Sequence, residues 1–369
     1  MPGDSRGPGR GEPLEAILLV GGLGTRLRPL TVSVPKPLLP TAGVPFLAHQ
    51  LARAASCGVT RVALATSYRS QMFAECFGDG SGLGLEIEYV HEEEPLGTGG
   101  GIRNAASRLR SGPDDPVVVL NGDVLSGHDL EAQLDLHRKS DAAVTLHLVE
   151  VPDPARFGCV PTDDNGRVTA FLEKTPHPVS NQINAGCYVY ARRAIDEIPP
   201  GRVVSVERES FPALIESGQV VMGYVDNSYW LDVGTPEAFV RGSCDLVLGR
   251  LASPAVPGPP GQALILPGAT VDVTANITGG TAVGAGATIG PDATVAGSVL
   301  FDNAIVAAGA HVCGSVLGRG AHVGDGVVLD GAVIGDEASV AAGNELRAGL
   351  RVWPGVKLDP VAIRFSTDV

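Results

Sequence analysis

The segment VGGLGTRLRPLTVSVPKPLLP, residues 20–40, contains the residue types that bind phosphate groups. Its 21 residues include three glycines, two arginines, one lysine and four prolines, and it follows a strand-like apolar run. Glycines let backbone N–H groups approach phosphate oxygens, and Arg26 and Lys36 would add positive charge. The prolines stiffen the rest of the loop, which favours a positioned loop over a plain surface turn. We interpret the segment, called the signature loop below, as a cradle for a triphosphate.

Two well-known phosphate loops do not fit this segment. A Walker A loop needs the sequence Gly-Lys-Ser/Thr, which the segment lacks. A dinucleotide-binding loop needs a third glycine, and Leu27 stands at that position after Gly22 and Gly24.

The composition excludes several classes of protein. The 369 residues carry 41 acidic against 27 basic side chains, a formal net charge of −14, which argues against a nucleic-acid partner. No apolar run approaches the roughly 20 residues of a membrane helix. Residues 1–13 are predicted to be a flexible tail without the apolar core of a signal peptide. The six cysteines are scattered without a Cys-x-x-Cys pair, which indicates reduced thiols in a cytoplasmic protein and neither zinc nor disulfides.

Residues 14–248 alternate between strand-like and helix-like segments, as a doubly wound α/β sheet does. Strands are expected at 16–20, 61–66, 85–90, 116–120 and 142–149, and helices at 45–58, 69–78, near 99–110 and near 128–139. Ligands of such sheets bind at the carboxyl ends of strands. The signature loop and the sequence Asn121-Gly122-Asp123 both follow a strand directly. A linker is predicted at 249–262, where 251–261 contain four prolines and no charge.

Residues 263–369 follow a different pattern. Aliphatic residues recur at steps of six, with five-residue steps at 295–300, 312–317 and 329–334, so that one turn takes 17 residues. The positions are Val283, Ile289, Val295, Leu300, Val306, Val312, Leu317, Val323, Leu329, Ile334, Val340, Leu346, Val352 and Leu358. This period is typical of hexapeptide repeats in a parallel β-helix, with small residues at the corners.

Further segments stand in the order of a known family. They are HEEEPLGTGGGI (91–102), NGDV (121–124), FGCV (157–160), FLEKT (171–175), QINAGCYVY (182–190) and YWLDVGTP (229–236). With the signature loop, they resemble the motifs of the sugar-1-phosphate nucleotidylyltransferases across nearly the whole chain. The resemblance implies a mixed-sheet nucleotidyltransferase domain followed by a left-handed β-helix. It also implies an in-line attack of a sugar phosphate on the α-phosphorus of a nucleoside triphosphate, with pyrophosphate as leaving group.

The resemblance assigns roles to individual residues. Arg26, Lys36 and Asp123 would be catalytic, with Asp123 and Asp232 as ligands of Mg²⁺. Nucleotide contacts would come from Gly21, Gly22, Gly24, Thr25, Glu92, Gly97 and Thr98. Sugar-phosphate contacts would come from Gly158, Glu173, Lys174 and Asn184. Without the resemblance, Asp123 is better explained as a turn residue beside Gly122, and Asp232 as a helix cap before Pro236.

The base and the sugar are less sharply indicated than the family. Guanine presents two adjacent N–H donors that the Glu92 carboxylate could accept together, which favours GTP. The resemblance implies mannose-1-phosphate as the acceptor. Residues 92–94 are three consecutive glutamates, so the register of the motif does not fix which of them contacts the base. Other pairs of nucleotide and sugar phosphate, such as glucose-1-phosphate with ATP, UTP or dTTP, remain open.

Two rival functions are weaker. An acyl-transfer role for the β-helix would need a base such as His311 or His322, but exposed corner histidines explain these residues more simply. A regulatory paralogue that binds sugar nucleotide without turnover should lack phosphate-loop or metal residues, and all are present. We expect the protein to be a homo-oligomer and the β-helix to be an oligomerisation or regulatory element.

Overall fold

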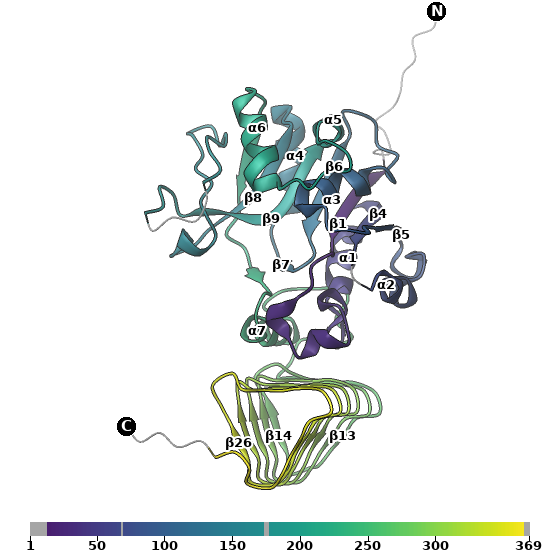
Figure 1. The fold of residues 1–369 in the computed structure, drawn as a ribbon, viewed down its shortest axis with the longest axis vertical. Coiled ribbons are helices and arrows are strands. Elements are labelled where there is room, and N and C mark those ends of the chain that lie inside the picture. Colours follow the sequence, from purple (N-terminus) through teal and green to yellow (C-terminus); the bar gives the residue numbers. More distant parts are fainter. Residues whose placement is uncertain (1–12, 68, 173–176, 365–369) are drawn as a thin grey trace, which may run out of the picture. The chain divides into compact units, whose positions relative to one another are not determined.

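The computed structural model describes residues 13–67, 69–172 and 177–364, which form two compact units (Figure 1). The first unit holds the described residues up to Gly22 together with 53–122 and 128–230. The second holds 23–52, 123–127 and the described residues from Leu231 onward. The signature loop beyond Gly22 therefore belongs to the same unit as the C-terminal repeats.

The first unit is built on a seven-stranded sheet with the order β10-β8-β9-β6-β1-β4-β5. The strands are β1 (Leu14–Leu19), β4 (Val59–Thr66), β5 (Glu86–His91), β6 (Pro116–Asn121), β8 (Val144–Glu150), β9 (Gln182–Ala191) and β10 (Val221–Val225). Strand β1 runs parallel to β4 and β6, whereas β9 is antiparallel to β6 and β8. The mixed α/β sheet predicted from the sequence is confirmed.

The four helices predicted from the sequence are present as α1 (Phe46–Ser56), α2 (Ser70–Phe77), α3 (Gly97–Ala106) and α4 (Leu130–Ser140). Two further helices, α5 (Arg192–Asp196) and α6 (Phe211–Glu216), were not predicted. The fully buried side chains of Ile17, Val119 and Tyr188 on one sheet face share a hydrophobic core with Ile102 of α3 and Phe211 of α6. This core fixes α3 against β1 and β4, and so fixes the segment that opens α3.

The second unit starts with the signature loop, which makes three short 3-10 turns at Thr25–Leu27, Leu30–Val32 and Lys36–Leu38. Two small sheets follow, one of β2 (Pro40–Thr41) with β3 (Val44–Pro45) and one of β7 (Val124–Ser126) with β11 (Trp230–Asp232). Helix α7 (Pro236–Val247) is capped by Thr235, whose hydroxyl oxygen accepts from the N–H of Ala238 at 3.2 Å. Asp232 is therefore not the cap of this helix.

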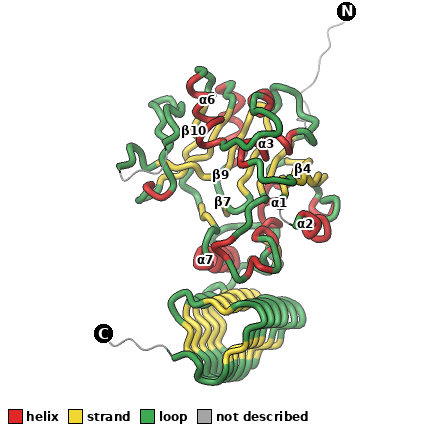
Figure 2. Tube along the Cα trace, viewed as in Figure 1, coloured by secondary structure: helices red, strands yellow, loops and turns green. Residues whose placement is uncertain are grey.

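The C-terminal repeats form three parallel sheets wound into a three-sided prism (Figure 2). The first sheet holds β12 (Ala263–Ile265), β15 (Thr281–Val283), β18 (Val299–Leu300), β21 (Val316–Leu317), β24 (Val333–Ile334) and β27 (Arg351–Val352). The second holds β13 (Thr270–Val271), β16 (Thr288–Ile289), β19 (Ile305–Val306), β22 (His322–Val323), β25 (Ser339–Val340) and β28 (Lys357–Leu358). The third holds β14 (Asn276–Thr278), β17 (Thr294–Ala296), β20 (His311–Cys313), β23 (Val328–Asp330) and β26 (Glu345–Leu346).

The aliphatic positions of the repeat line the inside of this prism. From Val283 to Val352 each of them is buried in one continuous core, and Leu358 packs against it partly buried. The predicted β-helix is confirmed, because only an inward-facing position on every strand buries aliphatics at this spacing.

The coil length varies along the prism. Ala282 pairs with Val299 and Val299 with Val316, both 17 residues apart, but Ala263 pairs with Thr281 and Val333 with Arg351, 18 apart. The 17-residue period read from the sequence therefore holds for the middle coils, and the end coils are one residue longer.

Exposed histidines lie in the β-helix, but not at its corners. His311 opens β20 and His322 opens β22, and both side chains face outward. Among the described residues, no helix combines the length and the apolar character that a membrane crossing requires.

Candidate active site

A cluster of two cations and two carboxylates lies in the second unit. Lys36 is buried, and its ammonium group donates to Oδ2 of Asp123 at 3.1 Å. Asp123 lies in the turn between β6 and β7, as a turn residue beside Gly122 would, so its turn role and its ion pair coexist. Asp232 ends β11, and the N–H of the following Val233 donates to the carbonyl oxygen of Asp123 at 2.9 Å. This backbone bond holds Asp123, in the turn before β7, beside the end of β11, which carries Asp232.

The surroundings of Asp232 disfavour the charged form of its carboxyl group. Burial raises its pKa, and repulsion by Asp123 raises it further, while Lys36 and Arg26 act in the opposite direction. Its Oδ1 atom is buried and has no hydrogen-bond partner within the protein. A buried carboxylate oxygen without a donor beside a second carboxylate is an arrangement that a cation stabilises.

Arg26, the middle residue of the first 3-10 turn, completes the cluster. Its guanidinium lies against Gly234, where a β-carbon would stand 2.6 Å from Nη2. Only glycine leaves room for the arginine there. Gly234 belongs to the YWLDVGTP motif but was not among the predicted site residues. Its position two residues after Asp232 is the sequence feature that could have indicated its role.

The signature loop is ordered by its own side chains. Gly24 adopts φ +60°, and a β-carbon on it would lie 2.9 Å from Cβ of Lys36 and 3.1 Å from Cγ2 of Thr31. The Thr31 hydroxyl donates to the carbonyl oxygen of Gly24 at 2.8 Å. Thr25, the predicted nucleotide contact that follows Gly24, is exposed. The close approach around Gly24 fixes the spacing between Lys36 and the start of the loop.

Other predicted nucleotide residues lie at the carboxyl edge of the large sheet, in the first unit. Gly21 follows β1, and its carbonyl oxygen accepts from the Ser67 hydroxyl at 2.6 Å. Gly22 is exposed, and no atom lies within 4 Å of the place that a β-carbon would take, so its backbone is open to a ligand. Glu92 follows β5, and its N–H donates to the carbonyl oxygen of Thr66 at 2.8 Å. The parallel pairing of β1, β4 and β5 brings these residues to one edge.

Glu92 is also part of the turn that leads into α3. Its Oε2 accepts from the N–H of Leu96 at 3.2 Å, and burial raises the pKa of its carboxyl. Glu93 and Glu94 are exposed, which distinguishes Glu92 from its neighbours.

Gly97 and Thr98 open α3 and pack against the chain at 204–207. A β-carbon on Gly97 would lie 2.6 Å from the carbonyl oxygen of Val204, and the residue has φ +71°. The Thr98 hydroxyl donates to Oε2 of Glu207 at 3.0 Å and accepts from the N–H of Val206 at 2.9 Å. The hydroxyl of Thr98 is thus engaged by the protein, so a nucleotide contact from this residue would come from its backbone.

The described part of the predicted sugar site consists of Gly158 and Asn184. Gly158 is buried with φ +81°, and its N–H donates to the carbonyl oxygen of Pro154 at 3.1 Å. Asn184 lies in β9, where its Nδ2 donates to the Tyr188 hydroxyl at 2.8 Å and its Oδ1 accepts from the N–H of Gly186 at 3.0 Å. Glu173 and Lys174 lie outside the described residues.

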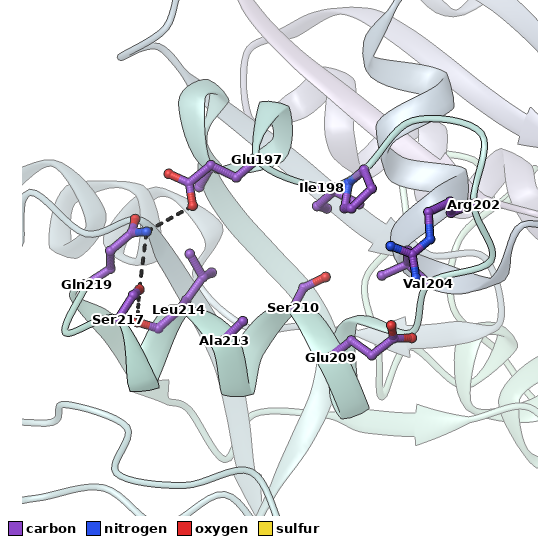
Figure 3. A pocket seen from close by; sticks show the side chains of 12 residues that line it. Glu197, Ile198, Arg202, Val204, Glu209, Ser210, Ala213, Leu214, Ser217 and Gln219 are labelled. Carbon is purple, nitrogen blue, oxygen red and sulfur yellow. Dashed lines mark hydrogen bonds between the residues drawn. The ribbon is translucent and has the colours of Figure 1, made fainter.

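A cavity of about 370 Å³ lies elsewhere in the first unit, between α5 and α6 (Figure 3). Its lining includes Glu197, Arg202 and Glu209 over an apolar floor of Ile198 and Leu214. None of the predicted site residues lines this cavity.

Comparisons with known proteins identify the family of this chain. The Nucleotidyl transferase family profile matches residues 15–247, and the GMPPB C-terminal domain profile matches residues 260–357. A mannose-1-phosphate guanylyltransferase of Mycobacterium tuberculosis is 60% identical over 96% of this chain and 99% of its own. The catalytic subunit beta of mannose-1-phosphate guanylyltransferase from Drosophila pseudoobscura pseudoobscura is 39% identical over 71% of each chain.

A solved structure shares the fold. HddC from Yersinia pseudotuberculosis, complexed with GMP-PN, has a TM-score of 0.54 and 28% sequence identity, covering 62% of this chain and 98% of its own. The chain belongs to the sugar-1-phosphate nucleotidylyltransferases of the Nucleotidyl transferase family, and it is similar to mannose-1-phosphate guanylyltransferases over most of its length.

Proposed function

We propose that this protein transfers the GMP group of GTP to mannose-1-phosphate, giving GDP-mannose and pyrophosphate. The observation that carries the proposal is the cluster of Arg26, Lys36, Asp123 and Asp232 in the second unit, together with the backbone of the signature loop. It combines cations for a triphosphate with carboxylates for a metal ion. The relative that covers 96% of the chain bears the name of this activity.

The reaction needs charge neutralisation and alignment more than proton transfer. A phosphate monoester has a second pKa of about 6, so the attacking sugar phosphate is already largely ionised at neutral pH. One of its oxygens attacks the α-phosphorus of GTP in line, and the bond from this phosphorus to the bridging oxygen of pyrophosphate breaks. Arg26 and Lys36 would bind the phosphate oxygens on which negative charge gathers.

Lys36 would change partners when the substrates bind. Its ammonium group is held by Asp123 at 3.1 Å in the structure. If Asp123 binds a cation instead, the ammonium group becomes available to a phosphate oxygen. The ion pair would thus keep Lys36 extended and buried before the triphosphate arrives.

The residues present fit a Mg²⁺ ion. Mg²⁺ is usually bound through one or two carboxylates, with the remaining positions taken by phosphate oxygens and water. Asp123 and Asp232 would hold it, since the Oδ1 atom of Asp232 is buried without a donor. Within the described residues no group of three or more histidine, cysteine or acidic side chains is arranged for a metal, so phosphate oxygens and water would fill the remaining positions. Bound there, Mg²⁺ would offset the charge of both carboxylates and of the triphosphate.

The assignment of base and sugar rests on the relatives and on Glu92. Guanine offers adjacent N1–H and N2–H donors, which a carboxylate can accept and an amide matches less well. The HddC structure was determined in complex with GMP-PN. The relatives reported above carry mannose-1-phosphate in their names.

The test is pyrophosphate release by the purified full-length protein with Mg²⁺. Each of GTP, ATP, UTP and dTTP would be offered with mannose-1-phosphate and with glucose-1-phosphate. Selective turnover of GTP with mannose-1-phosphate is the expected result, and Lys36→Met is the matched inactive control. Turnover of a different pair would overturn the assignment of base and sugar. Tight GTP binding with no turnover of any pair would indicate a regulatory paralogue instead.

We also propose that the protein is cytoplasmic and forms a homo-oligomer through its β-helix. Six free cysteines suit a reducing compartment. The β-helix exposes the apolar side chains of Ile305, Trp353 and Val356, which a second copy could cover. Sedimentation of Trp353→Ser against the unaltered protein tests the assembly, and an unchanged mass would argue against a contact through Trp353.

A further inference from the structure

The last coils of the β-helix contact the signature loop within the second unit. Arg351, the first residue of β27, donates from Nη1 to the carbonyl oxygens of Arg26 at 2.8 Å and of Arg28 at 2.6 Å. Asp336, in the turn after β24, accepts from the Ser33 hydroxyl at 2.7 Å. Both contacts come from the same side of the β-helix, because β24 and β27 are neighbours in one sheet.

These bonds fix the backbone that carries Arg26. The carbonyl groups of Arg26 and Arg28 stand at the end of the first 3-10 turn, which spans Thr25–Leu27. A charged donor makes a shorter and stronger hydrogen bond than a neutral one. By holding two nearby carbonyl oxygens with one nitrogen, Arg351 restricts rotation of the peptide groups that follow Arg26 and Arg28. The direction in which the Arg26 side chain leaves the loop depends on those peptide groups.

We propose that Arg351 is a positioning residue for the nucleotidyl transfer, which holds the signature loop in the conformation that directs Arg26 to the triphosphate. This inference rests on the proposed function above. It gives the β-helix a part in catalysis within its own chain, in addition to any role in assembly.

Attachment of the β-helix does not depend on Arg351. Helix α7 packs against β15 and β18, and Phe239 of α7 meets Phe301 of the β-helix with ring centroids 6.3 Å apart. A β-carbon on Gly43 would lie 3.0 Å from Leu266, so the β2–β3 turn is also packed closely against the β-helix. Arg351 itself is exposed. Its removal should therefore alter the loop without detaching the β-helix.

The experiment compares three variants of the full-length protein with Mg²⁺, GTP and mannose-1-phosphate. Arg351→Met removes both bonds, and Arg351→Lys keeps a charged nitrogen that can reach the carbonyl oxygens. Lys357→Met is the matched control, because Lys357 opens β28 in a different sheet and is exposed as well. For each variant we would measure kcat and KM for both substrates, the melting temperature, and hydrogen exchange of the amides at 23–34.

We expect Arg351→Met to lower kcat/KM for GTP by about tenfold, as a small misplacement of a catalytic group does. The KM for mannose-1-phosphate and the melting temperature should stay unchanged, and the amides at 23–34 should exchange faster. Arg351→Lys should recover most of the activity, and Lys357→Met should match the unaltered protein.

Several results would overturn the inference. They are unaltered kinetics in Arg351→Met, equal losses in Arg351→Lys and Arg351→Met, or a fall in melting temperature that parallels the loss of activity. The proposed function fails separately, if the unaltered protein turns over no GTP with mannose-1-phosphate. In that case faster exchange at 23–34 in Arg351→Met alone would still establish that Arg351 orders the loop, and unchanged exchange would refute it.

Discussion

The guanidinium group of Arg26 occupies the space that a side chain at Gly234 would need. A β-carbon there would lie 2.6 Å from Nη2 and 2.9 Å from Cζ of Arg26. These atoms are the end of a long, flexible side chain, so a methyl group would displace the guanidinium and leave the backbone intact. The two residues belong to separate sequence motifs that the fold brings together.

We therefore expect Gly234→Ala to impair activity more than stability. Displacing Arg26 from its place should lower kcat/KM for GTP by about tenfold or more. The melting temperature should change by less than about 3 °C, because no backbone position must shift. Steady-state kinetics and thermal unfolding give both values. Gly82→Ala is the control, since Gly82 is exposed with no atom within 4 Å of the added methyl group. Full activity in Gly234→Ala would show that the position of Arg26 seen here is not needed.

Asp232→Asn separates metal binding from folding. The substitution removes a partly buried negative charge that Asp123 repels, so the melting temperature without Mg²⁺ should stay the same or rise. Turnover should fall by about a hundredfold or more, because one of two proposed metal ligands is weakened. Thermal unfolding with and without Mg²⁺ and GTP would show the loss of a metal-dependent stabilisation.

Asp330→Asn, on the exposed face of the β-helix, is the control for a change of charge alone. A normal response to Mg²⁺ in Asp232→Asn would refute the role of Asp232 as a ligand.

The Thr98 hydroxyl gives a third prediction. Because it bridges Glu207 and the N–H of Val206, Thr98→Val should lower the free energy of unfolding by about 1–2 kcal/mol. Thr98→Ser keeps the hydroxyl and should restore most of the loss. Urea unfolding measures the difference. A raised KM for GTP with unchanged stability would instead indicate that the hydroxyl contacts the nucleotide.

Stability should fall in mild acid because of buried histidines. Burial lowers the pKa of His128 to about 2 and those of His137 and His147 to about 4. In the unfolded chain their pKa values return to about 6.5, so between pH 6.5 and pH 4 the unfolded chain binds protons that the folded protein does not. Each histidine thus contributes full stability above pH 6.5 and loses it as the pH falls, toward 4 for His137 and His147 and further for His128.

Unfolding by urea at pH 7.5 and pH 5.0 measures this effect. We expect the free energy of unfolding to be lower at pH 5.0 by at least about 1 kcal/mol. His311→Gln is the control, because His311 faces outward from β20, and it should leave the pH dependence unchanged. Equal stability at both pH values would contradict neutral burial of the three histidines.

The sequence predicts those features that repeat or that local chemistry requires. The β-helix could be predicted because each coil must bury aliphatics such as Val323 and Leu329 at a fixed spacing. Strands β1, β4 and β6 could be predicted because short apolar runs alternate with amphipathic helices. The 18-residue end coils are harder to predict, since adding one residue at a corner keeps the inward positions apolar.

The features that the sequence does not predict are contacts between segments that are distant in the chain. Nothing near Arg351 in the sequence indicates that it reaches the carbonyl oxygens of Arg26 and Arg28, which lie 325 and 323 positions away. Likewise, the partners of the Thr98 hydroxyl follow from how the chain at 204–207 returns to α3. Such contacts depend on the path of the whole chain, so a local sequence pattern does not indicate them.

The stacking of the coils sets fixed distances along the β-helix. Neighbouring strands in a sheet stand about 4.8 Å apart, so every coil lengthens the β-helix by that amount. Helix α7 contacts the coils that contain β15 and β18. The signature loop contacts Asp336, directly after β24, and Arg351 of β27. Deleting one whole coil between them would preserve the apolar repeat and still draw Arg351 back by about 4.8 Å, beyond hydrogen-bonding reach of the loop. The number of coils between these contacts therefore determines whether Arg351 reaches the signature loop. A protein of this fold with one coil more or fewer would need different contacts to hold the loop.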